Sequence, residues 1–194
     1  TSGGTEANAL ALTPGLRRGA AEPVRRLLVS AIEHTSVLSG GRFSPEAIGT
    51  VQVTGSGLID LDHLRKLVAV GQSALVSVML ANNETGALQP VGEVADIVHE
   101  AGGLLHVDAI QALGKIPFDI KSMKADLVTL SAHKVGGPKG VGALVLADEA
   151  QGLVPLLRGG GQELGRRAGT ENVAGISAFG VATAVAMAVL AGDA

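Results

Sequence analysis

The sequence contains no cysteine, no tryptophan and no tyrosine, and these absences exclude several kinds of function. Without cysteine the chain forms no disulfide and no thiolate metal site, and it has no cysteine nucleophile of its own. Aromatic residues are 2% of the chain, so we expect no aromatic platform for stacking nucleic-acid bases. The net charge is −3 and the basic residues are scattered, which does not favour binding to a phosphate backbone. The lack of cysteine suits a cytoplasmic location, which we expect for this protein.

The length and composition indicate a folded protein. A chain of 194 residues, 46% of them hydrophobic, can bury a sizeable core of Ala, Val, Leu and Ile, whereas a disordered segment has a lower apolar fraction. The chain opens with TSGGTEANAL and shows neither an initiator Met nor a basic-then-apolar leader. We therefore expect a piece of a longer protein, without a signal peptide.

One uncharged run, residues 173–192, is just long enough to cross a bilayer. About half of its residues are Ala and Gly, which contribute little to membrane insertion. We therefore expect a buried helix of small residues packed tightly against a sheet, and no membrane partner.

Short runs of β-branched residues alternate with helical patterns, which is typical of an α/β domain with a mostly parallel sheet. Helices are predicted for residues 60–70, with Asp60 as the N-cap, and for residues 91–102. Strands are predicted for residues 26–32, 51–54, 75–81, 104–108, 126–131 and 141–147.

Residues 2–12, SGGTEANALAL, lead from small residues and Thr5 into an apolar helical pattern. A helix that begins here offers free backbone N–H groups and the Thr5 hydroxyl to a phosphate. The alternative is an ordinary Ser/Thr cap with Glu6 in the first turn. Because the pattern is neither a Walker A loop nor GxGxxG, it does not by itself indicate a nucleotide.

The predicted strand at residues 104–108 ends at Asp108. A carboxylate there is partly desolvated and favours a cationic partner, either a side chain or a protonated heterocyclic nitrogen. A helix cap or salt bridge is the structural alternative. Gln111 follows at turn distance, and we expect His106, on the same strand face, to be a hydrogen-bonded packing residue.

Two further strands end in polar residues. Residues 82–86, NNETG, follow one strand and are open to interpretation as an Asx turn. His34 follows another strand, although a lone His is more often structural than catalytic. We expect His63 and His99, on predicted helices, to face solvent.

Lys134 follows the strand at residues 126–131, together with Ser131 and His133. If this strand is parallel to the one that ends at Asp108, these side chains meet at one edge of the sheet. A lysine in a semi-buried pocket is an amine nucleophile that can form an imine with a carbonyl. Three predicted features match pyridoxal 5′-phosphate (PLP). The helix start at residues 2–12 suits its phosphate, Asp108 suits its ring nitrogen, and Lys134 suits its aldehyde. We expect the pocket to be lined by three glycine clusters, at residues 3–4, 136–140 and 159–161.

The chain resembles the cysteine desulfurase and selenocysteine lyase group, in the class V aminotransferase branch of fold type I PLP enzymes. The resemblance implies a three-layer αβα sandwich with a mostly parallel mixed sheet. It rests on six motifs in order: SGGTEAN, EHTSV, NNETGALQP, HVDAIQALGK, SAHKVGGPKGVGAL and GGGQELGRRAGTENV.

The resemblance also implies roles for individual residues. Lys134 would bind the PLP aldehyde covalently, and His34 would stack on the ring and assist catalysis. Asp108 would contact the ring nitrogen and Gln111 the phenolate oxygen, with Asn83 beside that oxygen and the substrate carboxylate. The phosphate would be held by Gly4, Thr5, Ser131 and His133, and by Thr170 from the partner subunit of a homodimer.

Two features depart from the family pattern. Gly4 stands where the family has Ala, a change expected to loosen the turn without removing a hydrogen-bond donor. The mobile-loop Cys that takes up sulfur as a persulfide, and the Arg that binds the substrate carboxylate, are not found in residues 1–194. We therefore expect this chain to be the large PLP-binding domain, without an N-terminal segment and the small domain, and not a competent desulfurase alone.

The implied activity of the full-length protein is conversion of L-cysteine to L-alanine, with transfer of sulfur for iron-sulfur cluster or thio-cofactor assembly. The implied partners are a second copy of the chain and a sulfur-acceptor or scaffold protein. Two alternatives stay open. One is a selenocysteine lyase or another class V lyase or aminotransferase, and the other is a non-catalytic PLP-fold domain for dimerisation or scaffolding.

Overall fold

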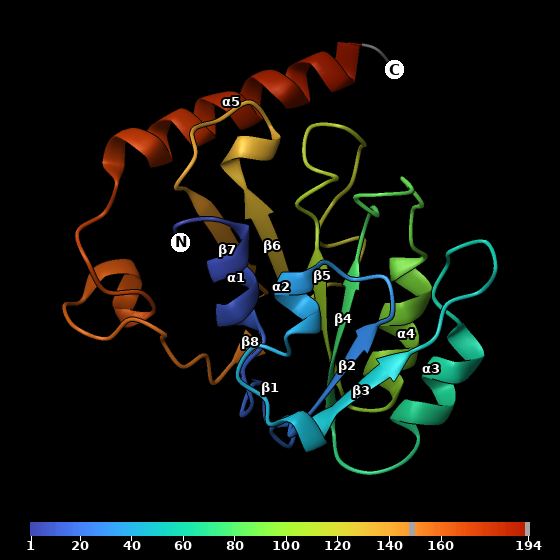
Figure 1. The fold of residues 1–194 in the computed structure, drawn as a ribbon. Helices are drawn as coiled ribbons and strands as arrows, with labels where there is room; N and C mark the ends of the chain where they lie inside the picture. Colours follow the sequence, from blue (N-terminus) through green and yellow to red (C-terminus); the bar gives the residue numbers. More distant parts are fainter. Residues whose placement is uncertain (148–149, 193–194) are drawn as a thin grey trace.

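The computed structural model describes residues 1–147 and 150–192, and its centre is a six-stranded sheet (Figure 1). The strand order is β3-β2-β4-β5-β6-β7, in which the first five strands are parallel and β7 is antiparallel to β6. This confirms the predicted mixed, mostly parallel sheet. The strands are β2 (Arg26–Ser30), β3 (Ile48–Val51), β4 (Ala74–Met79), β5 (Leu104–Asp108), β6 (Leu127–Ser131) and β7 (Gly142–Leu146). A separate antiparallel pair joins β1 (Arg17–Arg18) to β8 (Ala150–Gln151).

Five of the six predicted strands agree with the structure to within two residues at each end. The prediction of a strand at residues 51–54 is wrong, because β3 ends at Val51 and pairs Ile48–Val51 with β2. Beyond it, Val53 forms only an isolated bridge with Ile59. Gly49 weakens the strand pattern in the sequence. The structure shows close packing at this position, because a Cβ on residue 49 would come within 2.8 Å of Leu28 Cδ2.

Helices cover both faces of the sheet and give three layers (Figure 1). On one face α3 (Leu61–Val68) and α4 (Val91–Glu100) enclose a core that alternate strand residues such as Val76 and Val78 enter. On the other face α1 (Gly4–Ala11) and α2 (Thr35–Leu38) pack over residues such as Leu75. The alternation of neighbouring residues between the two cores confirms the predicted three-layer architecture. Short 3-10 turns are η1 (Pro45–Ala47), η2 (Ala132–Lys134) and η3 (Gln162–Gly165).

Helix α5 (Val173–Gly192) has the predicted bounds but not the predicted packing. Among its twenty residues only Gly175 is buried, and Val173, Val181 and Val185 expose 59–72% of their surface. In Figure 1 the helix (red) lies across the end of the structure, where it contacts η2. The prediction of tight burial is wrong because an all-round apolar pattern does not reveal whether another surface covers the helix. By length and composition alone, α5 also passes the test for a membrane span.

The structure confirms one cap and corrects one histidine. Asp60 caps α3 by accepting a hydrogen bond from the His63 N–H (2.9 Å). His99 does not face solvent as expected, because its Nε2 lies 2.8 Å from the buried carboxylate of Asp126. The ring of His63 is half-buried, and its Nδ1 accepts from the Gln52 N–H (3.0 Å).

Candidate active site

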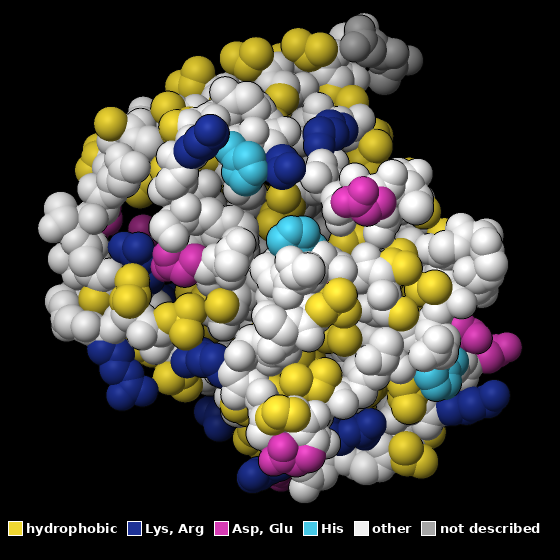
Figure 2. Space-filling view, viewed as in Figure 1, with side chains coloured by type: hydrophobic (Ala, Val, Ile, Leu, Met, Phe, Trp, Pro, Cys, Tyr) yellow, Lys and Arg dark blue, Asp and Glu magenta, His cyan; other side chains and the backbone are white. Residues whose placement is uncertain are grey.

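The carboxyl ends of the parallel strands and the N-terminus of α1 surround a cavity of about 300 Å³. Ligands bind at this edge in open α/β sheets. Figure 2 shows histidine (cyan) and Lys or Arg (dark blue) side chains gathered around a hollow on this face. Every predicted site residue except Thr170 lines the cavity. The lining is Gly4, Thr5, His34, Ser36, Met79, Ala81, Asn83, Asp108, Ile110, Gln111, Ser131, His133 and Lys134.

Asp108 lies at the end of β5 and is 6% exposed. Its Oδ2 accepts a hydrogen bond from Asn8 Nδ2 (2.9 Å), and its Oδ1 accepts one from the Ile110 N–H (3.0 Å). Burial raises the pKa of Asp108, and the two hydrogen bonds and the electrostatic effect of His34 offset this only in part. Among the described residues Asp108 has no ion-pair partner, so the cavity presents a desolvated carboxyl that a cationic ligand atom would stabilise.

The N-terminus of α1 brings Gly4 and Thr5 to the cavity. The first helical hydrogen bond runs from the Ala7 N–H to the Gly3 carbonyl (3.0 Å), so the N–H groups of residues 4–6 precede the bonded turns. Within the described residues no side chain caps this end. The alternative of an ordinary Ser/Thr cap is therefore wrong, and the free N–H groups and helix dipole suit an anion.

Gly4 leaves little room for a larger side chain. A Cβ at this position would lie 2.3 Å from Ile110 Cδ1 and 3.5 Å from Ser131 Cβ. The side chain of Ile110, two residues after Asp108, thus fills the space that an Ala methyl group would need. The expected loosening of the turn by Gly4 stays a prediction.

The turn η2 carries His133 and Lys134 beyond the end of β6, where both side chains are exposed. The expectation of a semi-buried lysine is therefore wrong in this chain, because the cavity is open to solvent on the side of η2. Ser131 is buried, and its Oγ lies 2.9 Å from His133 Nδ1.

The prediction that three glycine clusters line the cavity holds only for residues 3–4. The glycines at residues 136–140 follow η2, and those at residues 159–161 precede η3. Among the described residues, neither of these clusters reaches the cavity lining.

His34 and Asn83 reach the cavity from the loops after β2 and β4. His34 is the N-cap of α2, where its Nδ1 accepts from the Ser36 N–H (3.1 Å) and contacts Ser36 Oγ (2.8 Å). Residues 82–86 form an Asx turn, one of the interpretations of their sequence, because Asn82 Oδ1 accepts hydrogen bonds from the N–H groups of Glu84 and Thr85. This turn directs Asn83 to the cavity.

Gln111 lies one turn beyond Asp108 and is tied to a lysine. Its Oε1 accepts a hydrogen bond from Lys115 Nζ (2.6 Å). The pKa of Lys115 is lowered, by burial first and then by the nearby charge of Lys134. Because its oxygen already accepts from Lys115, the Gln111 amide can still donate hydrogen bonds through its NH₂ group.

Three polar residues in or behind the cavity lining were not predicted from the sequence: Ser36 lines the cavity, and Asn8 and Glu33 lie behind it. Asn8 is fully buried and bonds Asp108, and Ser36 joins Asn8 to His34. Glu33 is buried, and its Oε1 accepts from the Met79 N–H (2.8 Å). The only signal for Asn8 was a polar residue at a position where the helical pattern of α1 calls for an apolar one.

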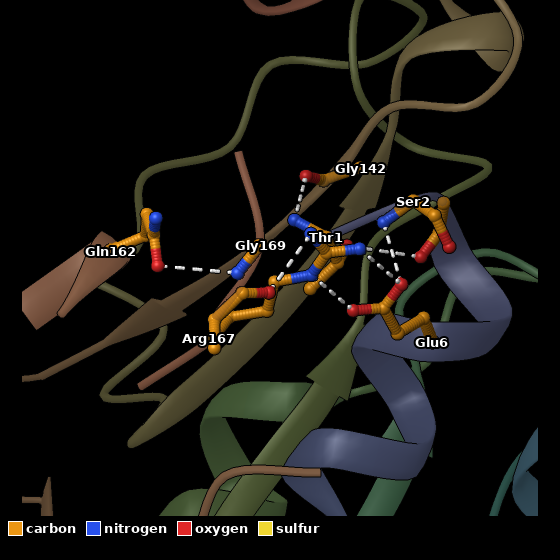
Figure 3. Close-up of polar contacts among 9 residues, drawn as sticks. Thr1, Ser2, Glu6, Gly142, Gln162, Arg167 and Gly169 are labelled. Atoms are coloured by element: carbon orange, nitrogen blue, oxygen red, sulfur yellow. Dashed lines mark hydrogen bonds and ion pairs between the residues drawn. The ribbon is translucent and has the colours of Figure 1, made fainter. Parts of the chain in front are cut away.

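Thr170 is exposed and lies at a different surface hollow, together with Ser2 and Arg167. Figure 3 shows how this segment is tied to α1 through Glu6. Arg167 Nε donates to Glu6 Oε1 (3.0 Å) and the Ser2 N–H donates to Glu6 Oε2 (2.9 Å). Burial alone would raise the pKa of Glu6, but the hydrogen bonds from Arg167 and Ser2 lower it to about 2. The expected contact of Thr170 with a partner's phosphate stays a prediction.

The family model for aminotransferase class-V matches residues 1–190. The chain is 43% identical over 190 residues to a cysteine desulfurase of Gluconacetobacter diazotrophicus, covering 96% of this chain and 46% of that protein. It is 44% identical over 186 residues to the cysteine desulfurase NifS of Azotobacter vinelandii, covering 94% of this chain and 45% of that protein. The chain thus spans about half the length of these curated relatives.

The chain is also similar to solved structures of related proteins. A NifS-like protein from Rickettsia africae superposes with a TM-score of 0.88 at 37% identity, over 98% of this chain and 51% of that one. DndA from Streptomyces lividans superposes with a TM-score of 0.80 at 35% identity, over 98% of this chain and 55% of that one. The fold therefore agrees with that of these solved proteins over nearly the whole chain.

Proposed function

The chain belongs to the aminotransferase class-V family, whose members are PLP-dependent, and we propose that it is the PLP-binding domain of a cysteine desulfurase. One observation carries the proposal: Lys134, Asp108 and the N-terminus of α1 line a single cavity. An amine, a carboxyl and a set of anion-binding N–H groups are the three features that PLP requires. The residues present therefore fit the cofactor.

The buried carboxyl of Asp108 is the sharpest test of this fit. Its pKa is raised by burial, and among the described residues no cation pairs with it. The protonated ring nitrogen of PLP would supply that cation, and Asp108 would in turn keep the nitrogen protonated. When bound, PLP supplies an aldehyde that condenses with amines and a ring that withdraws electrons from the substrate Cα.

Lys134 would provide the amine that holds the cofactor aldehyde. Its exposure beside the cavity would let this amine reach the substrate and move protons at Cα. In the overall reaction the Cβ–S bond of L-cysteine breaks, the sulfur passes to a cysteine thiolate outside residues 1–194, and protonation gives L-alanine. Because the relatives are about twice as long, the complete activity belongs to the full-length protein.

The remaining cavity residues bind and orient. The N–H groups of Gly4 and Thr5, the Thr5 hydroxyl, Ser131 and His133 would hold the phosphate. Gln111 would donate to the phenolate oxygen, because Lys115 already occupies its Oε1. His34 would stack on the ring, and Asn83 would contact the phenolate oxygen and the substrate carboxylate. Thr170, from the partner subunit of a homodimer, and a cytoplasmic location complete the proposal.

Absorbance of the full-length protein tests the proposal. Addition of PLP gives a visible band in the wild type, Lys134→Ala abolishes it, and Lys139→Ala, an exposed lysine in the next turn, retains it. Release of sulfide from L-cysteine under reducing conditions then exceeds release of selenide from selenocysteine. The reverse preference supports a selenocysteine lyase, and a colourless wild type overturns PLP binding in favour of a scaffold role.

A further inference from the structure

A continuous chain of buried hydrogen bonds runs below the cavity from β4 to Asp108. Ser77 Oγ lies 2.8 Å from His106 Nδ1, and His106 Nε2 lies 3.1 Å from Thr129 Oγ1. Thr129 Oγ1 lies 2.7 Å from Asn8 Oδ1, and Asn8 Nδ2 lies 2.9 Å from Asp108 Oδ2. The first four residues are each 0% exposed, so water does not substitute for any of these contacts.

The chain branches at Asn8. Asn8 Nδ2 also lies 2.9 Å from Ser36 Oγ, which contacts His34 Nδ1 at 2.8 Å. One buried amide therefore joins two side chains that are expected to contact the cofactor ring, Asp108 at its nitrogen and His34 by stacking.

The direction of every bond in the chain follows from one carboxylate. Asp108 Oδ2 accepts, so the amide of Asn8 presents its NH₂ group to Asp108 and its oxygen to Thr129. The oxygen only accepts, so the single hydroxyl proton of Thr129 is donated to Asn8. Thr129 then has only lone pairs to offer His106, and His106 Nε2 must carry a proton.

The direction of the hydrogen bond between Ser77 and His106, at the end farthest from Asp108, follows from the charge of His106. Burial lowers the pKa of His106 to about 3, so the ring is neutral and has a single N–H. Since Nε2 holds that proton, Nδ1 accepts from the Ser77 hydroxyl. Each donor along the chain thus points towards Asp108, and reversing any one of them leaves two donors or two acceptors facing each other.

We propose that His106, Thr129 and Asn8 are positioning residues, which act through this one-way chain to hold the carboxylate of Asp108 towards the cofactor. The inference rests on the proposed function, because it takes Asp108 as the partner of the PLP ring nitrogen. Without the Thr129 hydroxyl the Asn8 oxygen loses its buried donor, so the Asn8 amide, and through it the Asp108 carboxylate, is held less firmly. The site would bind a ring cation less well although its cavity would remain.

The matched variants are Thr129→Val and Thr129→Ser in the full-length protein. Valine keeps the shape and removes the hydroxyl, so we expect PLP affinity to fall roughly 10-fold and the absorbance of bound PLP to change with protonation of its ring. Serine restores the hydroxyl and is expected to restore affinity to within about 2-fold of the wild type. Ser77→Ala, at the far end, is expected to have the smaller effect.

A control separates positioning from simple support of the fold. Val128 is fully buried on the opposite face of β6, so Val128→Ala should lower the free energy of unfolding without changing PLP affinity or absorbance. If Thr129→Val behaves like Val128→Ala, the inference is overturned. If the wild type binds no PLP, the proposed function fails first, and the two failures are distinguishable.

Nitrogen-15 NMR of histidine-labelled wild type tests the same chain without a variant, in case Thr129→Val does not fold. The account requires His106 to have a protonated Nε2 and an unprotonated Nδ1. A protonated Nδ1, or protons on both nitrogens at neutral pH, contradicts it. This measurement is made in the absence of PLP and does not depend on activity.

Discussion

The region below the cavity and helix α5 differ in how residue type relates to burial: the first buries polar residues, and the second exposes apolar ones. Four polar residues are buried below the cavity and form hydrogen bonds with neighbouring elements: Asn8, Glu33, His106 and Asp108. Helix α5 has twenty uncharged residues and buries one. Burying a polar group is costly unless it is hydrogen-bonded, and hydrogen bonds offset that cost for these residues. The apolar helix shows that hydrophobicity in the sequence does not by itself produce burial.

Loss of the Asp108 carboxylate is the largest expected effect. Asp108→Ala removes the proposed partner of the ring nitrogen and should weaken PLP binding about 100-fold, since breaking a buried charged pair costs at least 2 kcal/mol. Fluorescence or absorbance titration of the full-length protein measures this. Asp62→Asn, on the exposed side of α3, is the control. Equal affinities for the two variants would remove Asp108 from the site.

Packing at the start of α1 is expected to give the next largest effect. In Gly4→Ala the new Cβ meets Ile110 Cδ1, so the Ile110 side chain must shift, which should lower the free energy of unfolding by about 1 kcal/mol. Ile110→Ala in the same chain should recover most of this loss. Gly92→Ala, in the first turn of α4, is the control, because a Cβ there meets no atom within 4 Å and a helix favours Ala over Gly. Additive effects of Gly4→Ala and Ile110→Ala would contradict the contact.

Glu33 gives a pH-dependent prediction. Burial raises the pKa of Glu33 well above its ordinary value, with Asp108 adding to the rise. The wild type therefore loses stability as the pH rises from the unfolded pKa through the folded one. Glu33→Gln avoids that loss and keeps the acceptor for Met79, so it should be more stable by about 1 kcal/mol or more at pH 8, and by almost nothing at pH 4. Denaturant unfolding at the two pH values measures the difference, and a gain that is equal at both contradicts the account.

The ion pair in Figure 3 should have a smaller effect of opposite pH dependence. The pKa of Glu6 is about 2, below its ordinary 4.5, so the stability that it contributes is present above pH 4.5 and is lost as the pH falls towards 2. Arg167→Ala should cost about 1 kcal/mol at pH 7, because the pair is partly exposed, and much less at pH 2, where Glu6 is partly protonated. Arg166→Ala, its exposed neighbour, should cost less at pH 7. A loss that persists at pH 2 would assign the effect to packing instead.

Substitutions on the exposed side of α5 should have the smallest effect. Val181→Ala and Val185→Ala in the 194-residue chain should change the free energy of unfolding by less than about 0.5 kcal/mol, since both side chains are exposed. Val94→Ala and Val98→Ala in α4 remove fully buried methyl groups and should each cost about 1–3 kcal/mol. Chemical denaturation compares the two pairs. Equal losses would show that α5 is buried in solution.

The sheet and the cavity were predictable for a common reason. Strands β5 and β6 are apolar runs that end in polar residues, and neighbouring parallel strands bring such ends together. Asp108 and Lys134 could therefore be placed at one edge from their order in the sequence. The position of Thr5 followed from the glycine-rich start of a helix.

The other features depend on contacts between residues far apart in the chain. Asn8 meets Asp108 across 100 residues and Thr129 across 121, and neither distance leaves a local pattern. The contact of Gly4 with Ile110 arises in the same way. Exposure of Lys134 and of α5 depends on which surfaces pack against them, and residue type does not determine that.

Reduction of the PLP-loaded full-length protein with borohydride, followed by peptide mass spectrometry, tests the central claim most directly. The reduction fixes PLP to the amine that holds it, and the neighbouring Lys115 and Lys139 are internal controls. The account predicts a pyridoxyl group on Lys134 alone. A label on another lysine, or no label on a protein that binds PLP, would contradict it.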